Sequence, residues 1–267
     1  MRTAIALVGL ALAACEPARV AIARYPGAPA AFDRAGADPQ ALAVADRAIA
    51  AAGGAAAWAA VRQLSWHLHL VQSDGSIVEA DEAWDRWNAR AHFRVQIGGD
   101  TDAIVKRDLY GTFRSVTAAV GRHVRSVVER DRKPLLDGAT RRWRFDTAEL
   151  CAPFLLEEPG SRIAYAGEEV TGGGLADIIA VTFDPRDAAR AGDVLHVIVA
   201  QDTGVVVRLE IERDGATIGY ALSGWTTVAG IRVPALARND VSGGEVAAFG
   251  AIAIGEPDGE LYSSDLP

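Results

Sequence analysis

The stretch LSWHLHLV, residues 64–71, decides the fold that we predict for this chain. Large apolar residues occupy every second position, namely Leu64, Trp66, Leu68 and Leu70. The residues between them are polar, as at Ser65, His67 and His69. A period of two is typical of a β-strand that buries one of its faces. We therefore expect a strand whose apolar side chains point to the concave side of a sheet.

The chain continues in the same pattern after this stretch. Residues 73–76, Ser-Asp-Gly-Ser, are typical of a turn, and residues 77–87 return as a second run. Phe93, Val95 and Ile97 alternate in the next run. Further runs follow at residues 162–170, 175–183, 194–200, 205–213, 217–225, 231–240 and 247–255. Turns rich in Gly and Asp separate these runs, which predicts an antiparallel meander.

This number of sequential strands predicts a mainly β (α+β) fold. We expect a large curled antiparallel sheet of about 10–11 strands that forms an incomplete barrel, because a flat sheet of that length is unusual. A few helices would pack on the concave face of this sheet. At 267 residues, a single β-rich domain has an ordinary size.

Two short helices are predicted before the first strand. Asp38 and Pro39 are typical of a helix start, since Asp caps the N-terminus and Pro fits the first helical position. Apolar residues then recur at spacings of three and four over residues 39–52. The glycine pair at residues 53–54 interrupts this helix, and residues 55–62 resume as a second one.

Residues 137–158 also break the β pattern, and here we expect a short helix that is kinked or ended at Pro153. The overlapping segment 121–144 holds eight basic and three acidic residues, in a chain whose net charge is −8. This local positive charge suits contact with a membrane surface or with anionic head groups. The alternative is an ordinary solvated loop and strand edge.

The first 15 residues predict an export signal that ends in a lipid attachment site. Arg2 precedes an apolar run at residues 4–14, which at 11 residues is shorter than the roughly 20 that a spanning helix needs. Residues 12–15, Leu-Ala-Ala-Cys, resemble a bacterial lipobox. This resemblance implies cleavage before Cys15 and its acylation, with more than one chain because a single acyl chain anchors only marginally. The alternative is an ordinary cleaved signal with an incidental cysteine.

The chain is therefore expected to have three parts: a signal peptide at 1–14, a lipidated cysteine with a flexible tether at 15–38, and one folded domain at 39–267. The residue after the cysteine is Glu16, not the Asp that is associated with retention in the inner membrane. We therefore expect the periplasmic face of the outer membrane. The negative net charge and this address argue against a nucleic-acid partner.

Four longer segments resemble the LolA/LolB-like half-barrel family of bacterial lipoprotein-sorting proteins. They are ADRAIAAAGGAAAWAAVRQL (45–64), FLLEEPGSRIAYAGEE (154–169), VIVAQDTGVVVRLE (197–210) and GWTTVAGIRVP (224–234). The resemblance extends from about residue 40 to residue 261. It implies an incompletely closed antiparallel barrel, with helices over an apolar concavity that holds acyl chains.

The predicted function is the binding of lipid or lipoprotein acyl chains for transport or sorting, by a monomer without catalysis, cofactor or metal. The predicted cavity residues are Trp66, Leu68, Leu70, Phe93, Val95, Phe154 and Leu155. The predicted head-group or membrane contacts are Arg141, Arg142, Trp143 and Arg144. A filled core would instead favour a non-catalytic scaffold lipoprotein of an envelope complex.

Other chemistry has weaker support in the sequence. His67 and His69 share a strand face, but two ligands do not make a zinc site. Glu79, Asp81 and Asp85 could serve a hydrolase of envelope glycans or lipids only if they lie inside the concavity. If Cys15 is lipidated, Cys151 has no disulfide partner, and we expect it to be a buried, inert thiol.

Overall fold

The computed structural model describes residues 29–111, 113–121, 123–187, 190–240 and 244–263. The predicted signal peptide and Cys15 lie outside these residues. The fold class is as predicted: the described chain is mainly β, with 13 strands in one open sheet, two in a small ribbon, and four helices. The number of strands exceeds the prediction because short strands with few apolar residues gave no clear alternating pattern.

The strand bounds follow the chain order. The first group is β1 (Gln63–Val71), β2 (Ile77–Asp85), β3 (Arg90–Gly98), β4 (Thr101–Asp108), β5 (Arg114–Val120) and β6 (His123–Ser126). The second is β7 (Ser161–Thr171), β8 (Gly174–Phe183), β9 (Val194–Ala200), β10 (Val206–Arg213) and β11 (Ala216–Ser223). The third is β12 (Thr226–Val228), β13 (Ile231–Val233), β14 (Leu236–Asn239) and β15 (Val246–Gly255).

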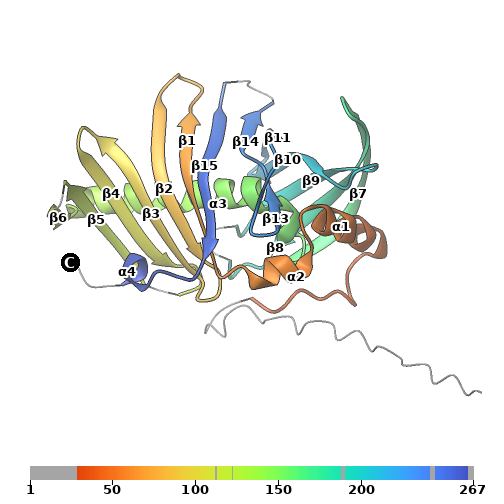
Figure 1. The fold of residues 1–267 in the computed structure, drawn as a ribbon, viewed down its shortest axis with the longest axis horizontal. Coiled ribbons are helices and arrows are strands. Elements are labelled where there is room, and N and C mark those ends of the chain that lie inside the picture. Colours follow the sequence, from red (N-terminus) through yellow and green to blue (C-terminus); the bar gives the residue numbers. More distant parts are fainter. Residues whose placement is uncertain (1–28, 112, 122, 188–189, 241–243, 264–267) are drawn as a thin grey trace, which may run out of the picture.

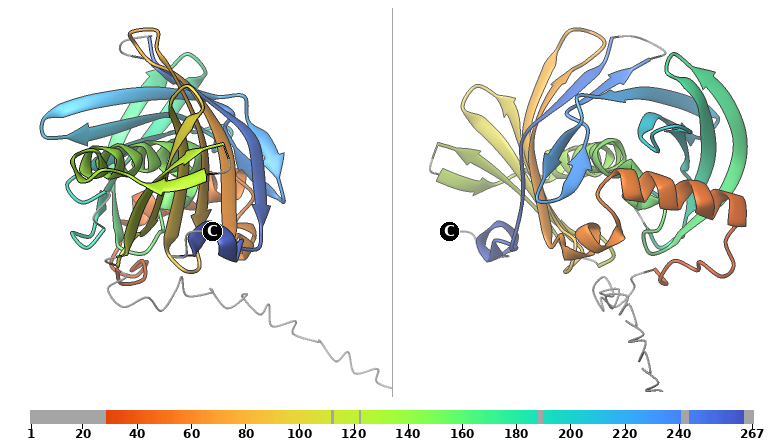
Figure 2. Two further views of the ribbon diagram at one scale, coloured as in Figure 1. Left: turned by 90° about the vertical axis from the view of Figure 1, so that its left-hand side faces the viewer. Right: turned by 45° about the vertical axis from the view of Figure 1, so that its right-hand side comes forward.

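The large sheet is antiparallel and has the order β6-β5-β4-β3-β2-β1-β15-β14-β11-β10-β9-β8-β7. Strand β1 joins the two halves, since it pairs with β2 on one side and with β15 on the other. Within the described chain the edge strands β6 and β7 do not pair with each other, so the barrel stays open. Figures 1 and 2 show the sheet curling around a long helix, α3.

The helix α1 (Pro39–Ala51) begins as predicted, because the side chain of Asp38 accepts hydrogen bonds from the N–H groups of Gln40 and Ala41. Its buried face packs against β7 and β8. The short helix α2 (Ala55–Ala60) follows the two glycines and buries Trp58. These two helices cover one end of the half-barrel (Figure 2).

The helix α3 (Glu129–Leu155) is far longer than the short helix predicted within residues 137–158. Its first four turns are rich in charge and lack a continuous apolar stripe, so periodicity did not reveal them. The predicted kink is present: Cys151 has non-helical dihedrals (φ −119°, ψ 16°), two residues before Pro153. Proline in a helix interior removes one hydrogen bond and clashes with the preceding turn, which accounts for the break.

Residues 29–38 belong to the predicted tether, yet they contact the domain. The carbonyl of Ala30 accepts a hydrogen bond from the N–H of Gly160 (2.8 Å), and Phe32 packs against the core. The guanidinium of Arg34 pairs with Glu157 and Asp46. The chain is therefore already held against the domain nine residues before α1 begins.

The C-terminal segment crosses the outside of the sheet. It carries the one-turn helix α4 (Gly259–Tyr262), which lies against β3 and β4. The hydroxyl of Tyr262 donates to the side-chain oxygen of Gln63 (3.0 Å). Among the four helices of the described chain, none has the length and apolar character that crossing a bilayer requires.

Candidate functional site

The residues predicted to line an apolar hollow lie together, but they form part of a packed core. Exposed fractions are 5% or less for Trp66, Leu68, Leu70, Phe93, Phe154 and Leu155, and Val95 is half-buried. The helix α3 lies across the concave face and fills the space that these side chains face. For example, the ring of Phe154 stacks on Trp58 with 4.3 Å between centroids. At these positions the predicted hollow is therefore occupied by the protein itself.

The concave side is less well covered where α3 begins, beside the edge strands β5 and β6. Here Val120 at the end of β5 is 36% exposed, and Val128 just before α3 is 57% exposed. Leu135 and Leu136, in the second turn of α3, are half-buried against the core. Val120 and Val128 lie at opposite ends of β6, since Val120 pairs with His123 and Val128 follows Ser126. We call these four residues, which border β6 and the start of α3, the open-end apolar group. These residues expose apolar surface next to the unpaired edge of the sheet.

Exposed basic side chains are frequent in the segments that border this end, from β5 along the first four turns of α3. They are Arg114, Arg125, Arg130, Arg132, Lys133 and Arg141. Three of them have acidic neighbours on α3: Arg130 with Asp131, Arg132 with Glu129 and Lys133 with Asp137. Exposed ion pairs of this kind contribute little and exchange readily, so these cations remain able to meet an anionic group.

Of the four predicted head-group contacts, only Arg141 is exposed. Trp143 is 1% exposed, and the guanidinium of Arg190 lies 4.5 Å from its ring centroid. Arg142 pairs with Asp146 and Glu149, and Arg144 pairs with Asp193. The predicted exposure is wrong for Arg142, Trp143 and Arg144, because this part of α3 is enclosed by the sheet and its charges are neutralised internally.

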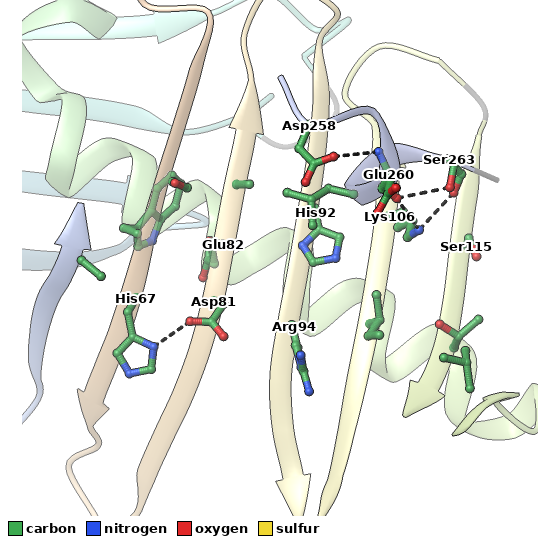
Figure 3. A pocket seen from close by; sticks show the side chains of 18 residues that line it. His67, Asp81, Glu82, His92, Arg94, Lys106, Ser115, Asp258, Glu260 and Ser263 are labelled. Atoms are coloured by element: carbon green, nitrogen blue, oxygen red, sulfur yellow. Dashed lines mark hydrogen bonds and ion pairs between the residues drawn. The ribbon is translucent and has the colours of Figure 1, made fainter. Parts of the chain in front are cut away.

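A pocket of about 740 Å³ lies on the opposite, outer face of β1–β5. Figure 3 shows the side chains of His67, Asp81, His92, Arg94 and Lys106 in front of the strands, with α3 behind them. The sequence did not reveal this pocket. The floor of the pocket is formed by the polar residues that alternate with the buried ones on these strands. The rim of the pocket comes from the C-terminal segment, which lies more than 150 residues away from Lys106 in the chain, so the strand pattern could not reveal it.

The C-terminal segment closes one side of this outer pocket. The ammonium of Lys106 donates to the carbonyl of Ser263 (3.1 Å) and lies 3.5 Å from that of Glu260. His92 is 8% exposed, and burial, together with nearby Lys106 and Arg94, lowers its pKa to about 4. This imidazole is therefore neutral near pH 7 and serves as a polar but uncharged part of the wall.

The two histidines of β1 form a network with carboxylates on the outer face. His67 contacts Asp81 through Nδ1 (2.8 Å) and Glu79 through Nε2 (3.1 Å), and His69 contacts Glu79 through Nδ1 (2.6 Å). The hydrogen bond to Asp81 raises the pKa of His67 above its ordinary value. Across the described residues, no group of three or more candidate ligands has the geometry to hold a metal ion.

The hydrolase alternative required Glu79, Asp81 and Asp85 inside the concavity. Glu79 and Asp81 lie on the outer face with 36% and 66% of their side chains exposed. Asp85 is fully buried and is held by Arg90 and Asn88. The three carboxylates therefore do not face a common interior space, and they do not form the site that the hydrolase alternative required.

Comparison with solved structures finds chains of similar fold. A domain from Vibrio parahaemolyticus, assigned as an outer membrane lipoprotein-sorting protein, matches over 83% of this chain and 96% of its own, with a TM-score of 0.49 and 10% identity. In fold the chain is similar to LolA-superfamily proteins. The LolA/LolB-like resemblance predicted from the sequence agrees with this likeness, which concerns the fold alone.

Two further structures match to the same degree. A LolA superfamily protein from Nitrosomonas europaea shares 9% identity, over 84% of this chain and 97% of its own. A DUF1329 family protein from Desulfovibrio piger shares 12% identity, over 83% and 96%. Both have a TM-score of 0.49, so the likeness concerns the fold alone. No protein-family model and no curated protein matches the chain.

Proposed function

We propose that this protein is a lipid-anchored envelope protein that binds the acyl chain of a lipid or lipoprotein, without catalysis, at the open end of its half-barrel. The observation that supports this proposal is the open-end apolar group. Val120 and Val128 expose apolar surface beside the unpaired edge of the sheet, and six exposed basic residues lie on the bordering strands and the first four turns of α3. Oily surface next to positive charge suits an acyl chain that carries an anionic head group.

Burial of an acyl chain alone can supply the free energy of binding that such a site needs. Burying an acyl chain contributes about 0.8 kcal/mol for each methylene group, so about ten methylenes would contribute about 8 kcal/mol. No specific polar contact is needed for useful affinity. The exposed arginines and lysine would then orient the head group and accelerate the approach of an anionic molecule.

Binding of a fluorescent fatty acid to the exported full chain carrying Cys15→Ala tests the proposal. A dansylated fatty acid should bind, and native mass spectrometry should detect lipid carried over from the host. The change Val128→Glu should weaken probe binding about tenfold or more, because it places a negative charge among apolar side chains and repels an anionic head group.

The change Ile77→Glu is the matched control. Ile77 is 58% exposed, close to the 57% of Val128, but lies at the start of β2, away from α3. This variant should bind the probe as tightly as the parent chain. A parent chain that neither binds the probe nor carries lipid would contradict the proposed function, as would equal losses in the two variants.

The second candidate function is the non-catalytic scaffold. The packing of Phe154 and Leu155 beneath the sheet, with exposed fractions of 2% and 0%, favours it, since a scaffold needs no hollow. The two candidates differ in the probe experiment, because a scaffold would leave the fatty acid unbound.

A further inference from the structure

A cluster of buried acidic residues joins α3 to the sheet at the centre of the concave face. Asp146 and Glu149 lie on α3 and are 0% exposed, and Glu82 of β2 faces them and is 3% exposed. Arg142, one turn earlier on α3, donates from Nε to Asp146 (2.5 Å) and from Nη2 to Glu149 (3.3 Å). Three carboxyl groups therefore share one guanidinium in the interior.

Several oxygens of this cluster have no hydrogen-bond partner among the described residues. They are both side-chain oxygens of Glu82, Oδ2 of Asp146 and Oε2 of Glu149. Unpaired buried carboxylates are costly, and the usual remedy in proteins is that the group takes up a proton. Glu82 lies next to Asp146, so a proton on one carboxyl group gives the pair a hydrogen bond that two carboxylates cannot make.

The surrounding groups do not supply the missing positive charge. From β11, Tyr220 donates its hydroxyl to Oε1 of Glu245 (3.0 Å), and the same oxygen lies 3.7 Å from Nη1 of Arg142. Glu245 thus adds a fourth carboxyl group around Arg142. Burial, and secondarily nearby Asp146, raises the pKa of Glu82 well above its ordinary value. Burial also raises the pKa of Glu149, to about 8.

The same helix contains a break that could act as a hinge. Arg142, Asp146 and Glu149 all precede Cys151, where the helical dihedrals are interrupted. Residues after the break, up to Leu156, are buried in the core, whereas the first turns of α3 are exposed. A movement of residues 129–150 about Cys151 would uncover Trp66 and Phe93 on the concave face.

We propose that the Glu82–Asp146–Glu149 cluster is a proton-operated latch, which holds α3 on the concave face when protonated and releases it when deprotonated. This inference deepens the proposed function, on which it rests, because the released helix would open the interior to an acyl chain. Protons are the ligands of this site, and no other reactant is required.

The direction of the pH effect follows from the raised pKa values. A carboxyl group that binds its proton more tightly in the closed state stabilises that state fully below its ordinary pKa, near 4.5. That stabilisation is lost as the pH rises through the raised values, which include about 8 for Glu149. The closed state should therefore lose stability as the pH rises from about 4.5 towards the raised values, and within that window each proton released multiplies the open population about tenfold per pH unit.

Hydrogen exchange of the lipid-free full chain between pH 6 and pH 9 tests the latch. After correction for intrinsic exchange rates, peptides from residues 129–150 should lose protection by about tenfold or more. Peptides from β8 should keep their protection, which distinguishes a local release from global unfolding. Equal protection of residues 129–150 at both pH values would overturn the inference.

The double variant Glu82→Gln/Glu149→Gln should remove this pH dependence, because the two amides are neutral at every pH and the amide at position 82 still offers a donor to Asp146. Circular dichroism checks its folding, and Glu149→Gln alone, which should flatten the response, provides a second variant if the first does not fold. The control Glu79→Gln, on the outer face, should respond to pH as the parent chain does. A pH response of full size in both Glu82→Gln/Glu149→Gln and Glu149→Gln would also overturn the latch. These exchange experiments contain no lipid, so a result that contradicts the latch would not affect the result of the fatty-acid binding experiment.

Discussion

Gly53 and Gly54 show how two neighbouring residues of one type can have different structural roles. Both have positive φ angles, of 111° and 92°, which side chains rarely tolerate. A Cβ atom at Gly53 would lie 2.2 Å from the carbonyl oxygen of Gly230, whereas one at Gly54 would meet no atom within 4 Å. Gly53 is therefore needed both for its backbone conformation and for the close approach of the segment before β13.

The two glycines give a prediction at the residue scale. Gly54→Ala should lower the free energy of unfolding by about 1–2 kcal/mol, which is the cost of the backbone strain alone. Gly53→Ala should lower it by about 3 kcal/mol or more, because the strain and the clash with Gly230 add. Urea denaturation of both variants measures the difference. A loss that is equal in the two would mean that the segment before β13 moves aside freely.

At the scale of elements, one buried ion pair connects three parts of the chain. Arg86 follows β2 and is 3% exposed, and Glu158 follows α3 and is 8% exposed. Nη2 of Arg86 donates to Oε1 of Glu158 (2.9 Å), and so does the indole nitrogen of Trp58 in α2 (3.0 Å). Arg86 also lies over the ring of Trp58, 3.7 Å from its centroid. The pair thus fixes α2, β2 and the end of α3 relative to one another.

Removing one partner of this pair should be strongly destabilising. Glu158→Ala should lower the free energy of unfolding by about 3–5 kcal/mol, because it leaves the charge of Arg86 buried and uncompensated. Glu256→Ala is the control: it also breaks an Arg–Glu pair, with Arg62, but Glu256 is 74% exposed. That change should cost about 0–1 kcal/mol. Thermal unfolding of the two variants compares them, and similar losses would contradict this role of the pair.

At the scale of the whole molecule, the position of the N-terminal segment bears on attachment. Residues 29–38 run along one side of the half-barrel, and the β1–β2 hairpin projects from the other (Figure 1). An anchor at Cys15 would leave only residues 16–28 between the membrane and the first described contact. Thirteen residues span at most about 45 Å, so the domain would stay within about that distance of the bilayer.

The anchor is tested by cell fractionation. Cys15→Ala should move the protein from the membrane fraction to the soluble fraction, because no acyl chain can be attached. Cys151→Ala is the matched control, since Cys151 is fully buried and should not affect attachment. Retention of the Cys15→Ala variant in washed membranes would exclude lipidation as the means of attachment.

Local pattern was sufficient for the main features of the fold. The alternation in residues 64–71 correctly predicted β1 and its buried side, and Asp38-Pro39 correctly predicted the start of α1. Both are properties of neighbouring residues, since the two faces of a strand and the cap of a helix depend on near neighbours alone. The kink before Pro153 was predictable for the same reason.

The sequence by itself determined that this protein is a curled antiparallel sheet with apolar residues such as Leu68 on its concave side. Only the tertiary structure decided what those residues face. The charged start of α3 shows no periodic pattern, yet the helix fills the concavity and pairs Arg142 with Asp146 there. Contacts between β2, α3 and the C-terminal segment join residues far apart in the chain, and periodicity carries no information about such contacts.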